Sequence, residues 1–512
     1  MKIIMHIGKA REVMSSYSKE GLTGLNIAEG YCDAAGVESR QEHDLLGARM
    51  VSADVYYGVH TLRAVENFSI TGIPISTYPT LIHALACVKQ AAARANNELG
   101  LLDTKKTEAI VKACKDVRAG QLHDQFVVDV IQGGAGTSTN MNANEVIANR
   151  ALEHLGYERG EYQYLHPLED VNLSQSTNDT YPTAVKVALH FSILRLAEAM
   201  SSLRSAFEIK ADEFGDVLKM GRTQLQEAVP MTLGQEFKAY AIMIGEDEER
   251  LKEASQLIQE INLGATAVGT GINAPSGYAE LACSHLAEIT GIPLLTSQDL
   301  VEATQDAGAF VQLSGVLKRV AVKLSKICND LRLLSSGPRA GLAEINLSPV
   351  QAGSSIMPGK VNPVIPEVVN QVAFEVIGND VTVSFAAEGG QLQEGGQLQL
   401  NAFEPIITHS LFESLSHLRA GCLTLAERCV EGITANRERL RLTVEHSAGI
   451  ATALNPHIGY TRSTQVAKEA MATGRSVYDL VLEKGLLSKE RLDEILNPQE
   501  LTNALPTLPE GS

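Results

Sequence analysis

The chain has 512 residues, of which 44% are apolar and 20% are charged. This composition is typical of a globular protein with a large core and excludes disorder as its main character. Its net charge of −18 disfavours nonspecific binding to nucleic acid or to an anionic membrane surface. Aromatic residues make up 5% and tryptophan is absent, so burial must come from Leu, Ile, Val and Ala, which favours helices.

The cellular compartment is predicted from the N-terminal sequence and the cysteines. Residues 1–41 contain no apolar core of a secretory signal, and no apolar run reaches the ~20 residues that span a bilayer. The seven cysteines are scattered and no CxxC pair occurs, which argues against a disulfide framework or a zinc site. We therefore predict a cytoplasmic protein with reduced thiols and no membrane partner.

Long helices are predicted in the middle of the chain. Between Phe310 and Leu334, apolar residues recur at alternating steps of three and four, a heptad pattern that predicts a helix packed against other helices. Similar Ala-, Leu- and Glu-rich segments cover residues 182–214, 232–261, 366–388 and 405–433. Five such helices, each about 35–45 Å long, predict an elongated bundle.

The predicted organisation is mainly α-helical, with three domains around this bundle, as a length of about 150 residues per domain also suggests. The predicted segments are an N-terminal extension of unknown role (1–41), an N-terminal domain (42–175), the central helical bundle (176–435) and a small C-terminal domain (436–512). The sequence EGGQLQ occurs twice in tandem at 388–399. We interpret this repeat as a loop expansion, and an altered site or interface as the alternative.

Four polar segments stand out, and most of them precede a predicted helix. They are residues 133–142, 174–179, 221–226 and 353–362. A helix N-terminus offers free backbone N–H groups and a positive partial charge, so several such ends could together bind an anion. For any one of the first three segments taken alone, helix capping is the favoured explanation. The fourth, Gly-Ser-Ser-Ile-Met-Pro-Gly-Lys, suits a mobile lid that brings Lys360 to a ligand.

Common nucleotide and hydrolase motifs do not fit. The spacing from Gly353 to Lys360 differs from that of a P-loop, and the segment 264–271 is not GxGxxG. No HExxH, EF-hand loop or GxSxG elbow occurs.

The segment GSSIMPGKVNPVIPEVVNQV (353–372) resembles the signature of the aspartase/fumarase superfamily, and within it the aspartases. DLLG (44–47) and YYGVHTLRAVENF (56–68) match the N-terminal region of that family. The resemblance covers the chain from about Glu42 into the C-terminal region. It implies a mainly α three-domain fold whose central bundle forms a twenty-helix core in a homotetramer, with each active site built from three chains.

The reaction that the resemblance implies is the reversible anti-elimination of ammonia from L-aspartate to give fumarate. Removing a proton beside a carboxylate leaves an aci-carboxylate, which must be stabilised by preorganised donors. No organic cofactor or metal ligand is implied, although activation by a divalent cation such as magnesium stays open.

The resemblance also implies a role for each site residue. Ser354 would be the general base, and Glu367 would at most orient its neighbours. The residues that would bind the β-carboxylate are Thr137, Ser138, Ser176, Thr177 and Ser355. Lys360 and Asn362 would hold the α-carboxylate. The amino group would be held by Asn178, Thr223 and Gln224.

Two alternatives stay open. The first is a class II fumarase, which converts fumarate to L-malate. The continuation VNPVIPEVVNQ, the order STNMN after Gly-Thr, and Gln224 where fumarases place a histidine favour the aspartase interpretation. The second is a non-catalytic structural homologue, against which the intact Ser354, Lys360 and Asn362 argue.

Overall fold

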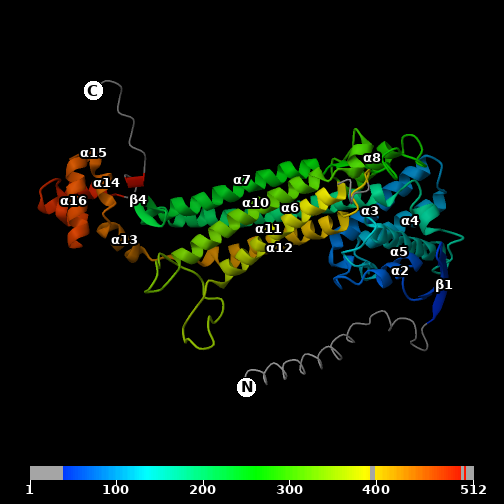
Figure 1. Ribbon diagram of the computed structural model, residues 1–512, viewed down its shortest axis with the longest axis horizontal. Coiled ribbons are helices and arrows are strands. Elements are labelled where there is room, and N and C mark those ends of the chain that lie inside the picture. The colour runs from blue at the N-terminus through cyan, green and yellow to red at the C-terminus, as the bar shows by residue number, and fades with distance from the viewer. Residues whose placement is uncertain (1–37, 392–397, 498–500, 503–512) are drawn as a thin grey trace, which may run out of the picture. The chain divides into compact units, whose positions relative to one another are not determined.

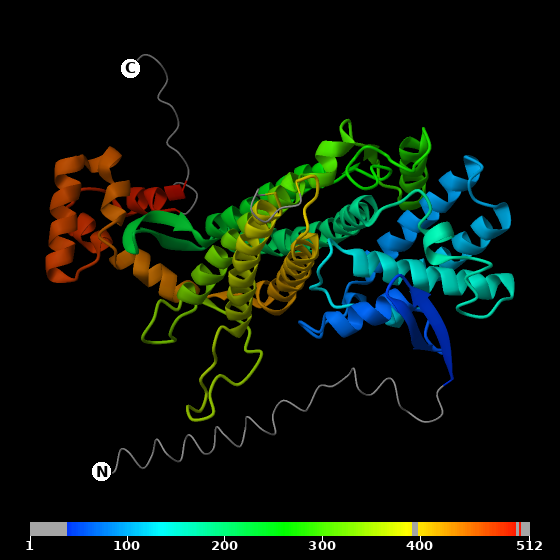
Figure 2. The ribbon, with the colours of Figure 1, turned by 45° about the vertical axis from the view of Figure 1, so that its right-hand side comes forward.

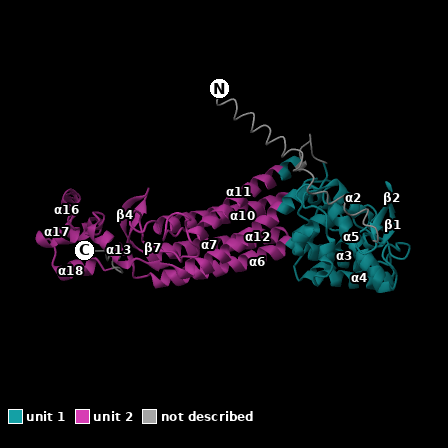
Figure 3. Ribbon diagram, turned by 90° about the horizontal axis from the view of Figure 1, so that it is seen from below, with its two compact units in different colours: residues 1–188, 259–306, 386–409 teal, residues 189–258, 307–385, 410–512 magenta. Residues whose placement is uncertain are grey.

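The computed structural model describes residues 38–391, 398–497 and 501–502 (Figure 1). It is mainly helical, and its sheets in the described ranges are four pairs of strands. The chain forms two compact units (Figure 3). Unit 1 comprises residues 1–188, 259–306 and 386–409, and unit 2 comprises residues 189–258, 307–385 and 410–512.

Unit 1 is built around α3 (Pro79–Glu98), which packs against α4, α5 and α8. Fourteen of the twenty residues of α3 are buried, most of them Ala, Leu, Val, Ile or Cys, as expected for a helix covered on several faces. The other helices of unit 1 are α2 (Val59–Asn67), α4 (Thr104–Arg118), α5 (Thr137–Leu155), α8 (Tyr278–Thr290) and α9 (Leu300–Gln305). Its strands are β1 (Ser39–Asp44) with β2 (Gly47–Ser52), and β5 (Glu260–Ile261) with β6 (Leu295–Thr296). Its short helical turns are η1 (Ile75–Thr77), η2 (His123–Gln125) and η3 (Pro167–Val171).

Unit 2 contains the predicted bundle, whose helices run side by side in Figure 3. The helices are α7 (Leu233–Leu257), α10 (Gly308–Leu334), and the unit 2 parts of α6 (Thr177–Glu213), α11 (Val364–Gln391) and α12 (Glu404–Arg428). Polar pairs join neighbours: Lys323 of α10 donates to Asp247 of α7 at 3.0 Å, and Asn370 of α11 donates to Ser325 of α10 at 2.9 Å.

The heptad prediction for residues 310–334 is confirmed. All eight positions are buried: Phe310, Leu313, Leu317, Val320, Leu324, Ile327, Leu331 and Leu334. The four other predicted long helices are also present, with ends shifted by a few residues.

One helix begins earlier than predicted. The sequence places the start of a long helix at Pro182, whereas α6 begins at Thr177 and contains that proline. Proline has no N–H, so the carbonyl of Asn178, four residues before it, loses its helical partner. Asn262 replaces that partner, because its Nδ2 donates to the Asn178 carbonyl at 3.1 Å. A side chain 84 residues away therefore allows the helix to extend through Pro182.

The remaining elements of unit 2 are two antiparallel strand pairs and a set of short helices. The pairs are β3 (Leu218–Thr223) with β4 (Gln226–Thr232), and β7 (Ile345–Asn346) with β8 (Thr434–Ala435). Figure 2 shows β1 and β2 in dark blue and β3 and β4 in green. After η4 (Val430–Gly432) come α13 (Arg437–His446), α14 (Ile450–Ala453), α15 (Asn455–Ile458), α16 (Tyr460–Thr473), α17 (Val477–Glu483) and α18 (Lys489–Ile495). These helices share a small core that includes Leu454, Val466, Leu480 and Leu492.

Three predictions about organisation concern segments that the structure describes only in part. Of the proposed extension 1–41, residues 1–37 lie outside the described residues, and Ser39 already belongs to β1. In the EGGQLQ repeat, residues 388–391 end α11 and residues 392–397 lie outside the described ranges. The domain boundaries at 41/42, 175/176 and 435/436 stay a prediction.

Candidate functional site

The first polar segment forms the start of α5. Gly136 adopts a φ of 88°, and the helix begins at Thr137. Thr137 is exposed and its Oγ1 donates to the Gly134 carbonyl at 2.7 Å, whereas Ser138 is buried. The N-cap residue Gly136 has no side chain, and Gln132 Oε1 accepts from the Thr139 N–H at 2.9 Å in its place, so capping does not explain the hydroxyl groups of Thr137 and Ser138. Both predicted binding residues lie in the first turn, where helical N–H groups have no helical partner.

The first and second polar segments are joined within unit 1. Asn140 of α5 donates from Nδ2 to Thr177 Oγ1 at 3.1 Å and to Asn172 Oδ1 at 3.2 Å. Asn172 Oδ1 also accepts from Lys89 Nζ at 2.9 Å, and Lys89 donates equally closely to Gln175 Oε1. Burial lowers the pKa of Lys89 to about 7. The Asn140 amide, which shares Asn172 Oδ1 with Lys89, therefore holds the Thr177 hydroxyl in place.

The second segment is also fixed to a loop that follows β5. Asp179 is fully buried; its Oδ1 accepts from the Ser176 N–H at 3.0 Å, and its Oδ2 accepts from the N–H groups of Gly264 at 3.1 Å and Thr266 at 2.9 Å. Burial raises the pKa of Asp179 to about 6, and these N–H donors oppose that rise. Asn178 donates from Nδ2 to the Ala267 carbonyl at 2.7 Å.

A cavity of about 170 Å³ opens between these two segments. Its lining residues are Ser174, Gln175, Ser176, Thr266, Ala267, Ile272 and Asn273. Residues 264–271 do not fit a nucleotide motif and have no predicted role, yet part of this segment lies beside the predicted Ser176. The signal in the sequence is Gly264: at a φ of 96°, a Cβ there would lie 2.6 Å from the Cβ of Ala279 in α8.

The fourth segment is a loop in unit 2 that closes on itself. The Gly353 N–H donates to the Lys360 carbonyl at 2.9 Å, and Asn362 donates from Nδ2 to the Gly353 carbonyl at 2.8 Å. Ser354 Oγ accepts from the N–H groups of Ile356 at 3.1 Å and Met357 at 2.9 Å. Asn362 therefore closes the base of a loop that presents Ser354 and Lys360.

The outward-facing side chains of this loop are exposed to solvent and accessible to a ligand. Ser355 and Lys360 are exposed, and Lys360 forms no ion pair with any residue that the structure describes. Ile356, on the same loop, is 82% exposed. Glu367 lies in the first turn of α11, directly after the loop.

The third segment is the tip of the β3–β4 hairpin. Thr223 pairs with Gln226, and the two residues between them, Gln224 and Leu225, have φ values of 52° and 64°. Positive φ at both turn positions is the geometry that matches strand twist in a two-residue hairpin, but it strains residues other than glycine. Thr223 and Gln224 are exposed, and among the described residues no hydrogen bond joins them to the 353–362 loop.

The structure thus brings the predicted residues together in groups. Ser176, Thr177 and Asn178 lie together and are linked to the start of α5, while Ser354 and Asn362 belong to one closed loop. Asp179, Lys89 and the loop after Gly264 contact residues 175–178 of the second segment, and no sequence motif predicts those contacts. Within the described ranges, no three His, Cys, Asp or Glu residues are placed to hold a metal ion. No helix there is long and apolar enough to cross a membrane.

The comparisons with known proteins identify the family. Residues 47–378 match the lyase family, and residues 450–503 match the fumarase C C-terminus. The chain belongs to this family of lyases, the aspartase/fumarase superfamily, as the sequence motifs predict.

Within the superfamily, the similar proteins include aspartate ammonia-lyases. The one from Pseudomonas aeruginosa is 60% identical over 90% of this chain and 97% of its own length. The one from Escherichia coli is 56% identical over 90% of this chain and 96% of its own length.

Solved structures share the fold. A fumarate lyase:delta crystallin from Brucella melitensis, bound to cobalt, is 56% identical with a TM-score of 0.88 over 91% of this chain and all of that chain. A class II fumarase from Schistosoma mansoni is 35% identical with a TM-score of 0.84 over 91% of this chain and 99% of that chain. The predicted mainly α fold of this superfamily is confirmed.

Proposed function

We propose that the chain is an aspartate ammonia-lyase, which catalyses the reversible elimination of ammonia from L-aspartate to give fumarate. The proposal rests on one observation: this chain is more similar in sequence to aspartate ammonia-lyases than to the class II fumarase. Aspartate ammonia-lyases are 56–60% identical over 90% of the chain, whereas the class II fumarase is 35% identical over a similar share. Substrate preference therefore follows the aspartase side of the family.

The polar segments supply the groups that this reaction needs. Abstraction of the proton at the carbon beside the β-carboxylate places extra negative charge on that carboxylate. Hydroxyl groups that are already fixed stabilise such charge without reorganisation at the moment of reaction. We assign the β-carboxylate to Thr137, Ser138, Ser176, Thr177 and Ser355. The bond from Asn140 to Thr177 Oγ1 supports this assignment, because it leaves the Thr177 hydroxyl hydrogen for a ligand.

We assign the general base to Ser354. A serine hydroxyl is a weak base unless its ionised form is stabilised. Two backbone N–H groups, those of Ile356 and Met357, already donate to Ser354 Oγ, and such donors favour the negatively charged form. Closure of the loop over a bound substrate would exclude water and strengthen both bonds.

The α-carboxylate and the ammonium group, both on the α-carbon of L-aspartate, require different partners. We assign the α-carboxylate to Lys360 and Asn362, since Lys360 is an exposed cation on the loop that carries the base. We assign the amino group to Asn178, Thr223 and Gln224. The Asn178 amide supports this assignment, because its Nδ2 donates to Ala267 and its Oδ1 is left to accept from an ammonium group.

We further propose that the protein is a homotetramer whose sites combine groups from three chains. One face of α11 supports assembly, since Phe374, Val381 and Phe385 are 62%, 50% and 72% exposed and are spaced seven and four residues apart. Light scattering after gel filtration tests this, and a monomer that turns over L-aspartate would contradict it.

A cytoplasmic location is supported by six cysteines in the described ranges that are buried and unpaired.

The test of the activity is the appearance of fumarate absorbance after adding L-aspartate, with L-malate measured in parallel. A response to L-malate alone would replace the proposal with a class II fumarase. No response to either substrate from a folded assembly would favour the non-catalytic structural homologue.

Activation by a divalent cation and the absence of an organic cofactor stay predictions. Repeating the assay after chelation and after adding magnesium tests whether a divalent cation activates the enzyme.

A further inference from the structure

Asp179 holds two segments that are 85 residues apart in the chain. Its side chain is 0% exposed and accepts three backbone N–H groups, one from Ser176 and two from the loop at Gly264 and Thr266. Thr180 Oγ1 lies 3.2 Å from Oδ1 as a fourth partner. A buried carboxylate is costly unless it is fully hydrogen-bonded, so its presence here requires that both segments stay in place.

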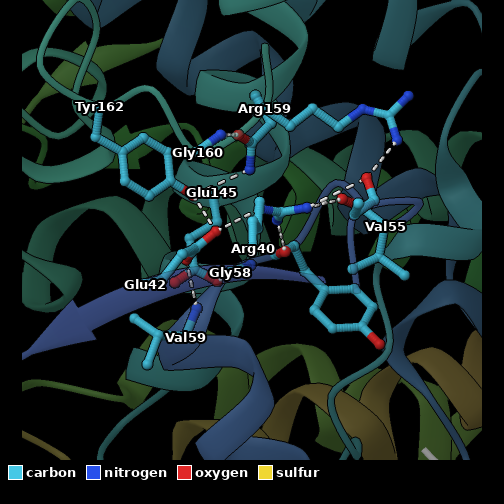
Figure 4. Close-up of polar contacts among 12 residues, drawn as sticks. Arg40, Glu42, Val55, Gly58, Val59, Glu145, Arg159, Gly160 and Tyr162 are labelled. Atoms are coloured by element: carbon cyan, nitrogen blue, oxygen red, sulfur yellow. Dashed lines mark hydrogen bonds and ion pairs between the residues drawn. The ribbon is translucent and has the colours of Figure 1, made fainter. Parts of the chain in front are cut away.

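Glu145 is a second buried carboxylate of unit 1 that accepts several backbone N–H groups (Figure 4). It is 1% exposed and accepts from the N–H groups of Gly58 and His60, both at 2.8 Å, and from the N–H and Oγ1 of Thr61. The residues that it holds, Gly58, His60 and Thr61, lie at the start of α2, and Thr61 is buried there. Glu145 therefore stabilises the N-terminus of α2 in the core of unit 1.

The segments that Asp179 holds differ in that they line the cavity described above. Three of the lining residues have left-handed backbones although none is glycine: Ser174, Thr266 and Asn273, with φ values of 61°, 57° and 66°. Thr266 is β-branched, for which this conformation is a genuine outlier. Its buried Oγ1 has no hydrogen-bond partner among the described residues. Strained backbone and an unpaired hydroxyl persist only where surrounding contacts impose them, commonly at functional sites.

We propose that the segment Gly264–Asn273 forms one wall of the substrate pocket and that Asp179 is the positioning residue that holds this wall against Ser176 and Asn178. The inference rests on the proposed function and adds to it the wall beside the substrate's ammonium group. Through the Asn178–Ala267 bond the wall orients the Asn178 amide so that Oδ1 accepts from that ammonium. The ligand class is thus a small α-amino acid with a free ammonium group.

The experiment compares Asp179→Asn with the matched variant Glu145→Gln in the full chain. Both substitutions neutralise a buried carboxylate that accepts backbone N–H groups, so both lower the melting temperature. We expect Asp179→Asn to raise the KM for L-aspartate at least about tenfold, because one tenfold step corresponds to about 1.4 kcal/mol, the usual cost of a lost hydrogen-bond partner. Glu145→Gln should keep the KM within about threefold of wild type.

An unchanged KM in Asp179→Asn, or an equal rise in Glu145→Gln, would overturn the proposal. If Asp179→Asn does not fold, hydrogen–deuterium exchange tests the proposal in the Ser354→Ala variant, which should bind L-aspartate without consuming it. Saturating L-aspartate should slow exchange in peptides covering 262–273 and leave those covering 56–64 unchanged. L-aspartate without effect on 262–273 would overturn the inference. Failure of the proposed function is distinguishable, since the wild type would then give no fumarate from L-aspartate.

Discussion

The polar segments of unit 1 and those of unit 2 are built in different ways. In unit 1, Thr177 and Asn178 are half-buried, and side-chain hydrogen bonds from Asn140 and to the Ala267 carbonyl fix them. In unit 2, Ser355 and Lys360 are exposed, and the loop that carries them is closed mainly by its own backbone and by Asn362. The first arrangement resists movement, whereas the second can move as a loop while its base stays closed.

This difference matches the two tasks of an elimination reaction. Donors that stabilise a developing negative charge are most effective when they are fixed in advance. A serine base, in contrast, needs water to be excluded after the substrate has entered, which requires a segment that can close. We therefore assign binding of the reacting carboxylate mainly to unit 1 and proton removal to the unit 2 loop.

The largest expected effect is that of Ser354→Ala. General-base catalysis contributes about 10²- to 10⁴-fold, so kcat for L-aspartate should fall by about that factor while assembly is unchanged. Steady-state kinetics at the fumarate band and gel filtration measure the two quantities.

The matched control for that variant is Ser336→Ala. Ser336 Oγ also accepts a loop N–H, that of Leu342 at 3.0 Å, but Ser336 has no proposed chemical role. It should keep kcat close to wild type. If Ser354→Ala were nearly as active as this control, the base assignment would be wrong and the exposed loop would have only a binding role.

A smaller effect is expected of Lys360→Gln. Hydrogen bonds to charged groups contribute about 1.5–3 kcal/mol, so removing this cation should raise the KM for L-aspartate about 10- to 100-fold. Lys112→Gln, which removes an exposed lysine of α4, should leave KM unchanged. Equal KM values in the two variants would show that the loop provides no carboxylate contact through Lys360.

The smallest expected effect is a change in how the melting temperature depends on pH, and it concerns Glu145 in the interior of unit 1. Burial, followed by the charge of Glu42, raises the pKa of Glu145 to about 7 from its ordinary 4.5. A raised folded-state pKa means that the group's contribution to stability is complete below pH 4.5 and is lost as the pH rises through about 7. Between pH 5 and 8 the melting temperature of Glu145→Gln should therefore fall less than that of wild type, by a few degrees.

Thermal scans of both proteins at these two pH values measure this difference. In the wild type, Arg40 and Tyr162 both donate to Glu42, the carboxylate near Glu145 (Figure 4), and the substitution changes none of these three residues. Identical pH slopes in the two proteins would mean that Glu145 does not titrate in this range.

Local patterns of the sequence were sufficient to predict the long helices and to locate the polar segments next to them. The alternating steps of three and four from Phe310 predict a buried helical face, because helix geometry fixes which residues share a face. The Gly-Ser-Ser loop and the Ser174–Asp179 segment were likewise recognisable, since short polar runs before helices depend on neighbouring residues only. These predictions involve contacts between residues close in the chain.

The contacts that depend on distant residues could be found only in the tertiary structure. The start of α6 at Thr177 depends on Asn262, and the placement of the Gly264–Asn273 loop depends on Asp179. Neither partner is near in sequence, so no local periodicity or motif indicates the pairing. The net charge of −18 and the heptads established an acidic, helix-rich chain. Long-range hydrogen bonds determined where α6 begins and which loop borders the cavity, because polar groups inside a protein are stable only when they are partnered.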